Sequence, residues 1–227
     1  MKYGIMGAMP DEVDQLCARL SGVEVQQYAG VEYHQGRLGD KEVVVCCAGM
    51  GKANAAATTQ VLCGKFGAQA IIFSGIAGNM SEEIGIGDVV VGKEVCYHDA
   101  EVSMICQSAP FLKSYTGDPA LVQAALDACA ALGVKAIAGR IATGDTFVGD
   151  GATKAVIAEK VRPDCVEMEG AAVSQIAARN GVPCVVLRAM SDNADESGHE
   201  LLVVKKFSIA EYVTTATAIV ARMLESL

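Results

Sequence analysis

Four carboxylates and one arginine stand at the ends of apolar runs, where ionised groups are uncommon. Glu12 lies in "GAMPDEV", Glu167 and Glu169 lie in "VEMEG", and Arg188 and Asp192 lie in "LRAMSDNAD". A carboxylate can activate a water molecule, whereas a carboxyl group kept protonated by an apolar pocket can give a proton to a leaving group. These residue types therefore predict acid–base catalysis, with Glu12 as a base and Asp192 as an acid.

Each of these residues also has a structural interpretation. Asp11 and Glu12 could stabilise the first turn of a helix, where the helix dipole favours negative charge. Arg188 could form a salt bridge with Asp192, because charged groups rarely enter buried runs unpaired. Glu169 could cap a helix, or it could accept hydrogen bonds from a diol such as that of a ribose. For Glu167 we expect a structural hydrogen-bond acceptor behind the site.

Two glycine-rich stretches do not match the known phosphate-binding motifs. "GIMGAM" lacks the GxGxxG spacing, and "CCAGMGKA" has Cys46 where a P-loop needs its first glycine and Ala53 where it needs Ser or Thr. We expect both stretches to be turns that let a ligand approach the backbone closely.

Charge and composition exclude several other functions. The net charge of −9 argues against nucleic-acid binding, which needs a basic surface, and the lysines of "VKK" at 204–206 are expected to begin an exposed helix. The nine cysteines contain no CxxC and are predicted to be reduced core residues of a cytosolic protein. Of the three histidines, only His98 has a nearby cysteine, Cys96, so no metal site is expected. No signal peptide or membrane span is predicted, which indicates a cytoplasmic protein.

Alternating apolar runs and helical periods must position these residues. Strands are predicted at 2–7, 42–49, 68–75, 87–100, 135–145 and 183–192, and helices at 11–20, 51–65, 118–132, 152–160, 169–180 and 207–226. Residues 23–47 read as consecutive strands with turns at "AG" and "LGD". The fold class is therefore α/β, with a mixed central sheet between helix layers in one domain over 1–227. In such sheets ligands bind beyond the carboxyl ends of the strands.

Seven stretches, in order, resemble the 5′-methylthioadenosine/S-adenosylhomocysteine nucleosidases of the nucleoside phosphorylase and nucleosidase superfamily. They are "GAMPDEV", "SGIAGN", "GDVVV", "YHDAEV", "ATGDTFV", "VEMEGAAV" and "RAMSDNAD", and "VEMEGAA" followed by "RAMSD" is the most specific pair. The resemblance implies a nucleoside phosphorylase-like fold and hydrolysis of the N-glycosidic bond of a 5′-substituted adenosine, without metal or cofactor.

The resemblance also implies roles for individual residues. Glu12 corresponds to the general base that acts on the attacking water, and Asp192 to the general acid at purine N7. Glu169 corresponds to the glutamate that binds the ribose hydroxyls. The remaining residues that we expect to bind substrate are Phe147 and Val148 at the adenine, Met168 at the sugar, Arg188 near the sugar and the water, and Ile76, Met9, Met50 and Ser191.

Hydrolysis is expected rather than phosphorolysis, because the loops "GAMPDE" and "IIFSGIAG" contain none of the arginines with which related phosphorylases hold phosphate. The resemblance further implies a homodimer in which residues 101–117 line the pocket for the 5′-substituent, yet Ile105 and Gln107 stand where the family has aromatics. The preferred 5′-substituent stays open. Alternatives are a futalosine-type nucleosidase, a purine nucleoside phosphorylase and a non-catalytic nucleoside-binding protein.

Overall fold

The structure is a computed structural model that describes residues 1–199 and 210–227. Its strands are β1 (Lys2–Gly7), β2 (Ser21–Tyr28), β3 (Val31–Leu38), β4 (Lys41–Cys47), β5 (Ala70–Asn79), β6 (Val89–Tyr97), β7 (Tyr115–Thr116), β8 (Ala136–Thr143), β9 (Cys165–Glu167) and β10 (Cys184–Asp192). Its helices are α1 (Pro10–Cys17), α2 (Lys52–Gly64), α3 (Val102–Ile105), α4 (Pro119–Ala131), α5 (Gly151–Val161), α6 (Gly170–Arg179), α7 (Glu196–His199) and α8 (Ala210–Ser226).

The strands form one sheet in the order β10-β6-β8-β9-β5-β1-β4-β3-β2, with β7 attached to β6 and a further pairing of β10 with β5. β1 pairs in parallel with β4 and β5, and β10 pairs in parallel with β5. The predicted mixed sheet is confirmed, and its antiparallel pairings occur in two regions. The hairpins of β2, β3 and β4 are antiparallel, as expected. In addition, β10 is antiparallel to β6 and β5 is antiparallel to β9.

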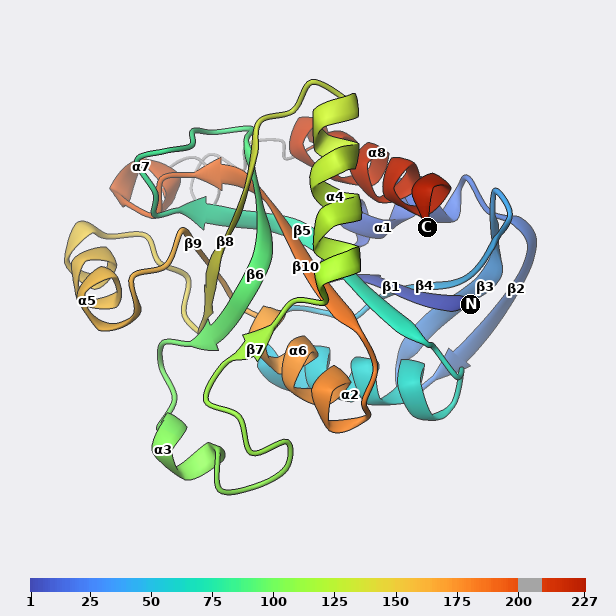
Figure 1. Ribbon diagram of the computed structural model, residues 1–227, viewed down its shortest axis with the longest axis horizontal. Helices are drawn as coiled ribbons and strands as arrows, with labels where there is room; N and C mark the ends of the chain where they lie inside the picture. The colour runs from blue at the N-terminus through green and yellow to red at the C-terminus, as the bar shows by residue number, and fades with distance from the viewer. Residues whose placement is uncertain (200–209) are drawn as a thin grey trace.

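Helices cover both faces of the sheet, which confirms the three predicted layers (Figure 1). α2 packs on α6 on one face, and α8 contacts both α1 and α4 on the other. The unbroken apolar run of β4 is explained by the helices on its two faces. Val44 and Cys46 belong to the core under α2 and α6, whereas Val43 and Val45 belong to the core under α1, α4 and α8. Each face of such a strand meets a helix layer, so alternation with polar residues is lost.

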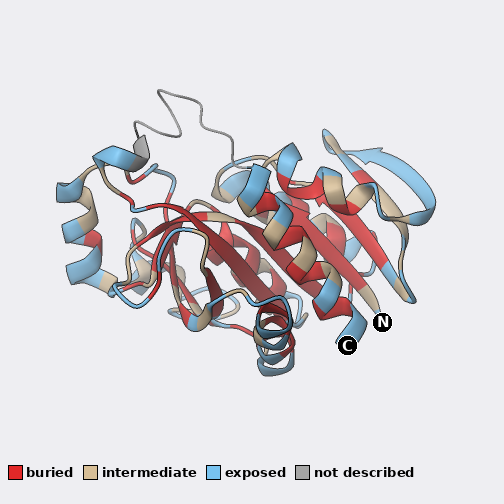
Figure 2. Ribbon diagram, turned by 90° about the horizontal axis from the view of Figure 1, so that it is seen from above, coloured by how far each residue is buried: buried red, intermediate tan, exposed pale blue. Residues whose placement is uncertain are grey.

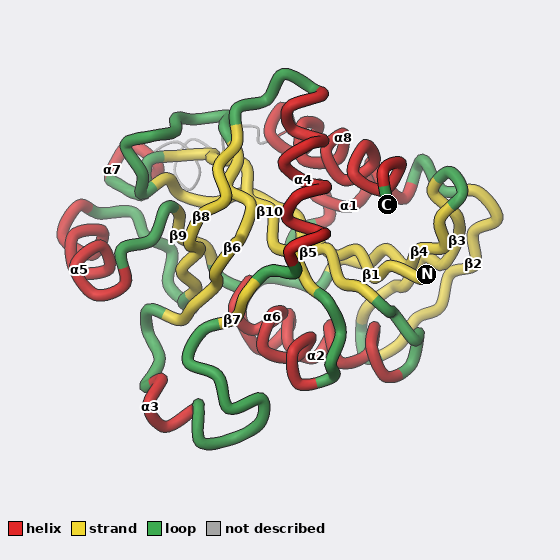
Figure 3. The backbone as a smooth tube through the Cα atoms, viewed as in Figure 1, coloured by secondary structure: helices red, strands yellow, loops and turns green. Residues whose placement is uncertain are grey.

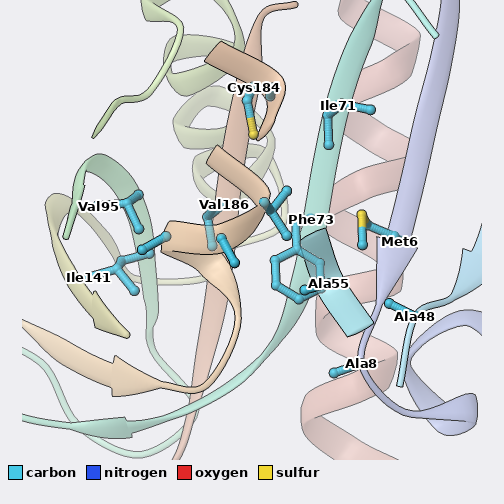
Figure 4. Packing of buried hydrophobic residues seen from close by; sticks show 14 of the residues in the cluster. Met6, Ala8, Ala48, Ala55, Ile71, Phe73, Val95, Ile141, Cys184 and Val186 are labelled. Atoms are coloured by element: carbon cyan, nitrogen blue, oxygen red, sulfur yellow. The ribbon is translucent and has the colours of Figure 1, made fainter. Parts of the chain in front are cut away.

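The core beneath α2 and α6 gathers side chains from many strands (Figure 4). Met6 of β1, Phe73 of β5 and Val186 of β10 are at most 1% exposed there. Full burial of a side chain of this size stabilises a fold by about 1.5–3 kcal/mol relative to exposure. These buried side chains anchor the strands whose ends carry the predicted site residues.

The periphery of the sheet is more exposed than its centre. Every residue of β2 is exposed, and β2 forms the pale blue edge on the right of Figure 2. Its turn at Ala29 and Gly30 has positive φ at both residues, 51° and 79°, as expected for a tight two-residue hairpin loop. The predicted turns at "AG" and "LGD" are therefore confirmed.

Several short elements were not predicted. α3, β7 and α7 contain two to four residues each, too few to show a hydrophobic period. β9 is equally short, but the buried strand expected just before Met168 and Glu169 is confirmed. The segment "VKK" at 204–206 and the first residues of the helix predicted at 207–226 lie outside the described residues. The nine cysteines are all free, and five of them are buried. No helix in residues 1–199 and 210–227 combines the length and the hydropathy that a membrane span needs.

Candidate active site

A cavity of about 390 Å³ lies beyond the ends of β1, β5, β9 and β10. It contains ten of the eleven residues predicted from the sequence, so segments from residue 9 to residue 192 meet in one place. The lining residues are Ala8, Met9, Asp11, Glu12, Met50, Ile76, Ala77, Gly78, Phe147, Val166, Glu167, Met168, Glu169, Arg188, Ser191 and Asp192. We call Glu12, Glu167, Glu169, Arg188 and Asp192 the buried wall of the cavity.

Glu12 is 5% exposed and is held by three backbone N–H groups. Its Oε2 accepts hydrogen bonds from Ala8 at 2.6 Å and Met9 at 2.9 Å, and its Oε1 accepts one from Ile76 at 3.2 Å. Burial raises the pKa of Glu12, although Arg188 and these N–H groups act in the opposite direction. The carboxylate is thus fixed in position and is a stronger base than an exposed glutamate.

Tight backbone packing lets Glu12 and Arg188 approach each other. A Cβ atom at Gly75 would lie 2.5 Å from Glu12 Oε1 and would collide with Arg188 Nη1. Glycine is therefore required in "SGIAGN" for steric reasons, since any side chain would displace both groups.

Arg188 pairs with Glu167 and Glu169 and not with Asp192, so the sequence alternative of an Arg188–Asp192 salt bridge is wrong. Arg188 Nη2 contacts Glu167 Oε2 and lies 3.4 Å from Glu169 Oε2. The guanidinium carbon also lies 4.2 Å from the centre of the Phe73 ring. Burial opposes the charge of Arg188, but the two glutamates outweigh it and raise its pKa.

Glu167 holds the start of α6. Its Oε2 accepts from the N–H groups of Glu169 at 3.1 Å and Gly170 at 2.7 Å, and its Oε1 accepts from the Thr143 hydroxyl. These contacts satisfy N–H groups that a helix start leaves unpaired. The expected role of a structural acceptor agrees with these contacts, although Glu167 also lines the cavity.

Glu169 is the residue that precedes α6, but its side chain does not cap that helix, so the capping alternative is wrong. Its Oε1 instead accepts a hydrogen bond of 2.8 Å from the N–H of Gly51, at the start of α2. Burial, followed by repulsion from Glu167, raises the pKa of Glu169. One oxygen of the carboxylate is thus tied to α2, and the other faces Arg188.

Asp192 lies at the end of β10 and is 4% exposed. The Ser191 hydroxyl donates to its Oδ2 at 2.8 Å, and the Ala194 N–H donates to its Oδ1 at 2.8 Å. A Cβ atom at Gly78 would stand 3.0 Å from Asp192 Oδ1. These contacts direct the carboxyl group toward the part of the cavity that also contains Phe147 and Met168.

Phe147 and Met50 also line the cavity, and we call residues 145–148 together with Met50 the loop wall. Phe147 is 38% exposed and Met50 is 63% exposed, so this side opens to solvent. Val148 does not line the main cavity. It is 5% exposed and lines an adjoining hollow of about 30 Å³, which shares Phe147, Met168 and Asp192 with the cavity.

Sequence reasoning assigned no role in the site to Thr143 or Gly51, and it gave Asp11 only the structural role of stabilising a helix start. Thr143 and Gly51 act through hydrogen bonds to Glu167 and Glu169, and Asp11 lines the cavity. All three stand in stretches that the sequence had singled out, "ATGDTFV", the glycine-rich turn "CCAGMGKA" and "GAMPDEV". The long-range pairing of Gly51 with Glu169 has no local signature.

The arrangement offers a fixed carboxylate at Glu12 and two further buried carboxyl groups at Glu169 and Asp192. In the described part of the chain, no group of three or more His, Cys, Asp or Glu side chains could hold a metal ion. Carboxyl groups can transfer protons, and Glu12 and Asp192 reach the cavity from different elements, the start of α1 and the end of β10.

Comparison with known proteins gives three kinds of match. Residues 2–225 match the model of the phosphorylase superfamily. A 5′-methylthioadenosine/S-adenosylhomocysteine nucleosidase of Shewanella sediminis is 42% identical, covering 86% of this chain and 87% of its own. The nucleosidase of Colwellia psychrerythraea in complex with adenine has a TM-score of 0.92 at 32% identity, over 100% of this chain and 96% of its own. The futalosine hydrolase of Helicobacter pylori has a TM-score of 0.89 at 30% identity, over 100% and 98%.

Proposed function

Since the chain belongs to the 5′-methylthioadenosine/S-adenosylhomocysteine nucleosidase family of the phosphorylase superfamily, we propose that it hydrolyses the N-glycosidic bond of a 5′-modified adenosine. Methylthioadenosine and adenosylhomocysteine are the proposed substrates, with adenine and the 5-thio-substituted ribose as products. The observation that carries the proposal is the meeting of Glu12, Glu169 and Asp192 in one cavity.

We assign the proton transfers as follows. A water molecule attacks C1′ of the ribose and loses a proton to Glu12, whose buried carboxylate is held by three N–H groups. The electron pair of the C1′–N9 bond passes to the purine, which takes a proton at N7 from Asp192. Positive charge grows on the sugar as this bond breaks, so the carboxylates of the buried wall stabilise the transition state.

Substrate contacts follow from the lining of the cavity. Glu169 Oε2, which lies 3.4 Å from Arg188 Nη2, accepts hydrogen bonds from the ribose hydroxyls, and Met168 packs against the sugar. Phe147 and Val148 hold the adenine, because they share the adjoining hollow with Asp192. Arg188 acts near the sugar and the water. Met9, Met50, Ile76 and Ser191 complete the surround of the substrate.

Water is favoured over phosphate as the second substrate. Among the described residues, Arg188 is the one arginine that lines the cavity, and the ion pairs it forms with them are to the cavity glutamates Glu167 and Glu169. Asp11 and Glu12 add negative charge at the first loop. A phosphate dianion would therefore meet an excess of carboxylates, which makes its binding unfavourable.

The exposed apolar residues of segment 101–117 support a homodimer. Met104, Phe111 and Leu112 are 64%, 69% and 43% exposed, and the segment projects from the body of the fold around α3 (Figure 1). Such residues are typical of surfaces that bind a partner. We propose that the protein is a cytoplasmic homodimer whose subunits each form a single domain over 1–227. Light scattering on the purified protein measures the mass and so tests the dimer.

The direct test of the function is to incubate the protein with methylthioadenosine, with and without phosphate, and to follow adenine release. We expect equal release in both conditions. Strict dependence on phosphate would indicate a phosphorylase, and binding without release would indicate a nucleoside-binding protein. Futalosine in a parallel reaction tests the second candidate, which the similarity to a futalosine hydrolase favours.

A further inference from the structure

The start of α2 contacts a carboxylate from each half of the cavity. The N–H of Gly51 donates to Glu169 Oε1 at 2.8 Å, and the next N–H along the chain, that of Lys52, donates to Asp145 Oδ1 at 2.9 Å. Glu169 belongs to the proposed ribose subsite, and Asp145 stands two residues before Phe147 of the proposed base subsite. The positive end of the helix dipole favours both contacts. One rigid helix of 13 residues thus touches both subsites.

The Lys52 side chain strengthens the contact on the base side. Its Nζ lies 2.9 and 2.8 Å from the two oxygens of Asp99 and 3.4 Å from Asp145 Oδ2. The N–H of Asp145 donates to Asp99 Oδ2 at 2.9 Å, which closes the network. The Lys52 and Asp99 side chains are 24% and 28% exposed, so solvent screens their attraction less than that of a surface pair.

The loop that this network holds has little structure of its own. Residues 144–150 contain neither helix nor strand, as the green segment between β8 and α5 shows (Figure 3). Its position relative to the cavity is therefore set by side-chain contacts. Glycine is favoured at Gly51 because the backbone there has a φ of 93°, a conformation that residues with a side chain rarely adopt.

We propose that Lys52 is a positioning residue that couples the base subsite to the ribose subsite. Lys52 does not line the cavity, so it acts through Asp145 and Asp99 on the Phe147 loop and, through its neighbour Gly51, on Glu169. Adenine in contact with Phe147 favours the loop position in which Asp145 meets the start of α2, and the same helix start holds Glu169 through Gly51. Because coupling between sites is reciprocal, a sugar in the ribose subsite strengthens adenine binding by the same factor. The inference rests on the proposed function for the identity of the two ligands.

The test measures adenine binding by calorimetry, with and without saturating 5-methylthioribose. In the wild-type protein we expect the sugar to tighten adenine binding about five-fold or more, which is the lower range of measured couplings. In Lys52→Met we expect this factor to fall toward one and KM for methylthioadenosine to rise more than kcat falls. Lys52→Arg should restore most of the coupling, because it keeps the positive charge.

Two further variants keep the test decisive. Asp145→Asn retains an acceptor for the Lys52 N–H but loses the charge, so the same loss is expected with a smaller amplitude. Lys135→Met is the matched control, since Lys135 pairs with Asp88 at 4.0 Å and does not line the cavity. Its coupling should equal that of the wild type. A Lys52→Met protein that melts like the wild type and keeps full coupling overturns the inference, and so does a wild type without coupling.

Failure of the proposed function is seen in a different measurement. Wild-type protein that releases no adenine from methylthioadenosine contradicts the proposed substrate. Wild-type protein that releases adenine, together with full coupling in both Lys52→Met and Asp145→Asn, contradicts only the role of Lys52.

Discussion

The two sides of the cavity are built in opposite ways. The buried wall stands on strand ends, and its side chains are at most 8% exposed. The loop wall stands on an irregular segment, in which Phe147 is 38% exposed. Asp145 in this segment forms an ion pair with Lys52, and the Asp145 side chain is 54% exposed. The buried wall therefore shares the stability of the core, whereas the loop wall can move or change at little cost. This difference suits a site in which proton transfer needs carboxyl groups in fixed positions, while the adenine of the substrate must enter and leave.

The largest effect that the comparison predicts is on stability at the buried wall. Arg188→Met leaves Glu167 and Glu169 buried without their cation, so we expect a loss of about 3–5 kcal/mol in the free energy of unfolding. Denaturant titration measures it. Protonated carboxyl groups need no cation, so the loss should shrink as the pH falls.

Arg222→Met is the matched control for Arg188→Met, because Arg222 and its partner Glu225 are 53% and 64% exposed. We expect a change within about 0.5 kcal/mol, as for most surface substitutions. If the two variants lose equal free energy of unfolding, the ion pairs of the buried wall contribute no more to stability than a surface pair.

Asp192→Asn separates catalysis from stability on the same wall. The amide keeps the shape of the carboxyl group but cannot give its proton, so turnover of methylthioadenosine should fall by about 10²–10⁴-fold. Binding of a non-hydrolysable substrate analogue should change little. Asp127→Asn on the surface of α4 is the control, and near-normal turnover in Asp192→Asn would remove Asp192 from its role.

Glu12 predicts a pH dependence with a defined sign. Burial raises its pKa, and a base must be unprotonated, so kcat/KM should rise with pH through a value above the ordinary 4.5. The protonated form is favoured by folding, so the stability that Glu12 contributes is present below pH 4.5 and is lost as pH rises through the raised pKa.

Glu12→Gln checks this sign without relying on activity. The variant should be inactive, and its free energy of unfolding relative to the wild type should increase as the pH rises above 4.5, because only the wild type must ionise a buried group. A stability difference that stays constant with pH would contradict the raised pKa. A fully active variant would mean that another group activates the water.

The smallest predicted effect is on the loop wall. Phe147→Ala should weaken adenine binding by about 0.5–1.5 kcal/mol, the typical value of an aromatic contact, with little change in melting temperature. Phe66→Ala is the opposite control, because Phe66 is 6% exposed and stacks on Tyr33 at 4.5 Å. It should cost about 3–5 kcal/mol of stability and leave adenine affinity unchanged in the folded protein. If Phe147→Ala mainly lowered stability and Phe66→Ala mainly weakened adenine binding, the contrast between the loop wall and the buried interior would be wrong.

The sequence predicted the buried wall better than the loop wall. Apolar runs that end in a charge, such as "VVLRAMSD", mark a strand and the polar group beyond it, and parallel strands direct such ends to one edge. Asp145 ends such a run, but nothing in the sequence indicates its contacts with α2, and Lys52 carries no mark because a charged residue at a helix start is ordinary on a protein surface. The wrong pairing of Arg188 with Asp192 has a related cause, since proximity in the chain suggested a bond that the strand geometry does not allow.

The sequence by itself determined the order of strands and helices, the mixed sheet and the family, because these depend on local periodicity and on motifs of a few residues. Only the tertiary structure decided which charges meet. Glu167 and Glu169 share Arg188 from another strand, and Gly51 contacts Glu169 from 118 residues away in the chain. Side-chain pairing depends on sheet register and on the backbone approach that glycines such as Gly75 permit. Neither has a local pattern, so the partners through which Glu167 and Glu169 act become visible only in the folded protein.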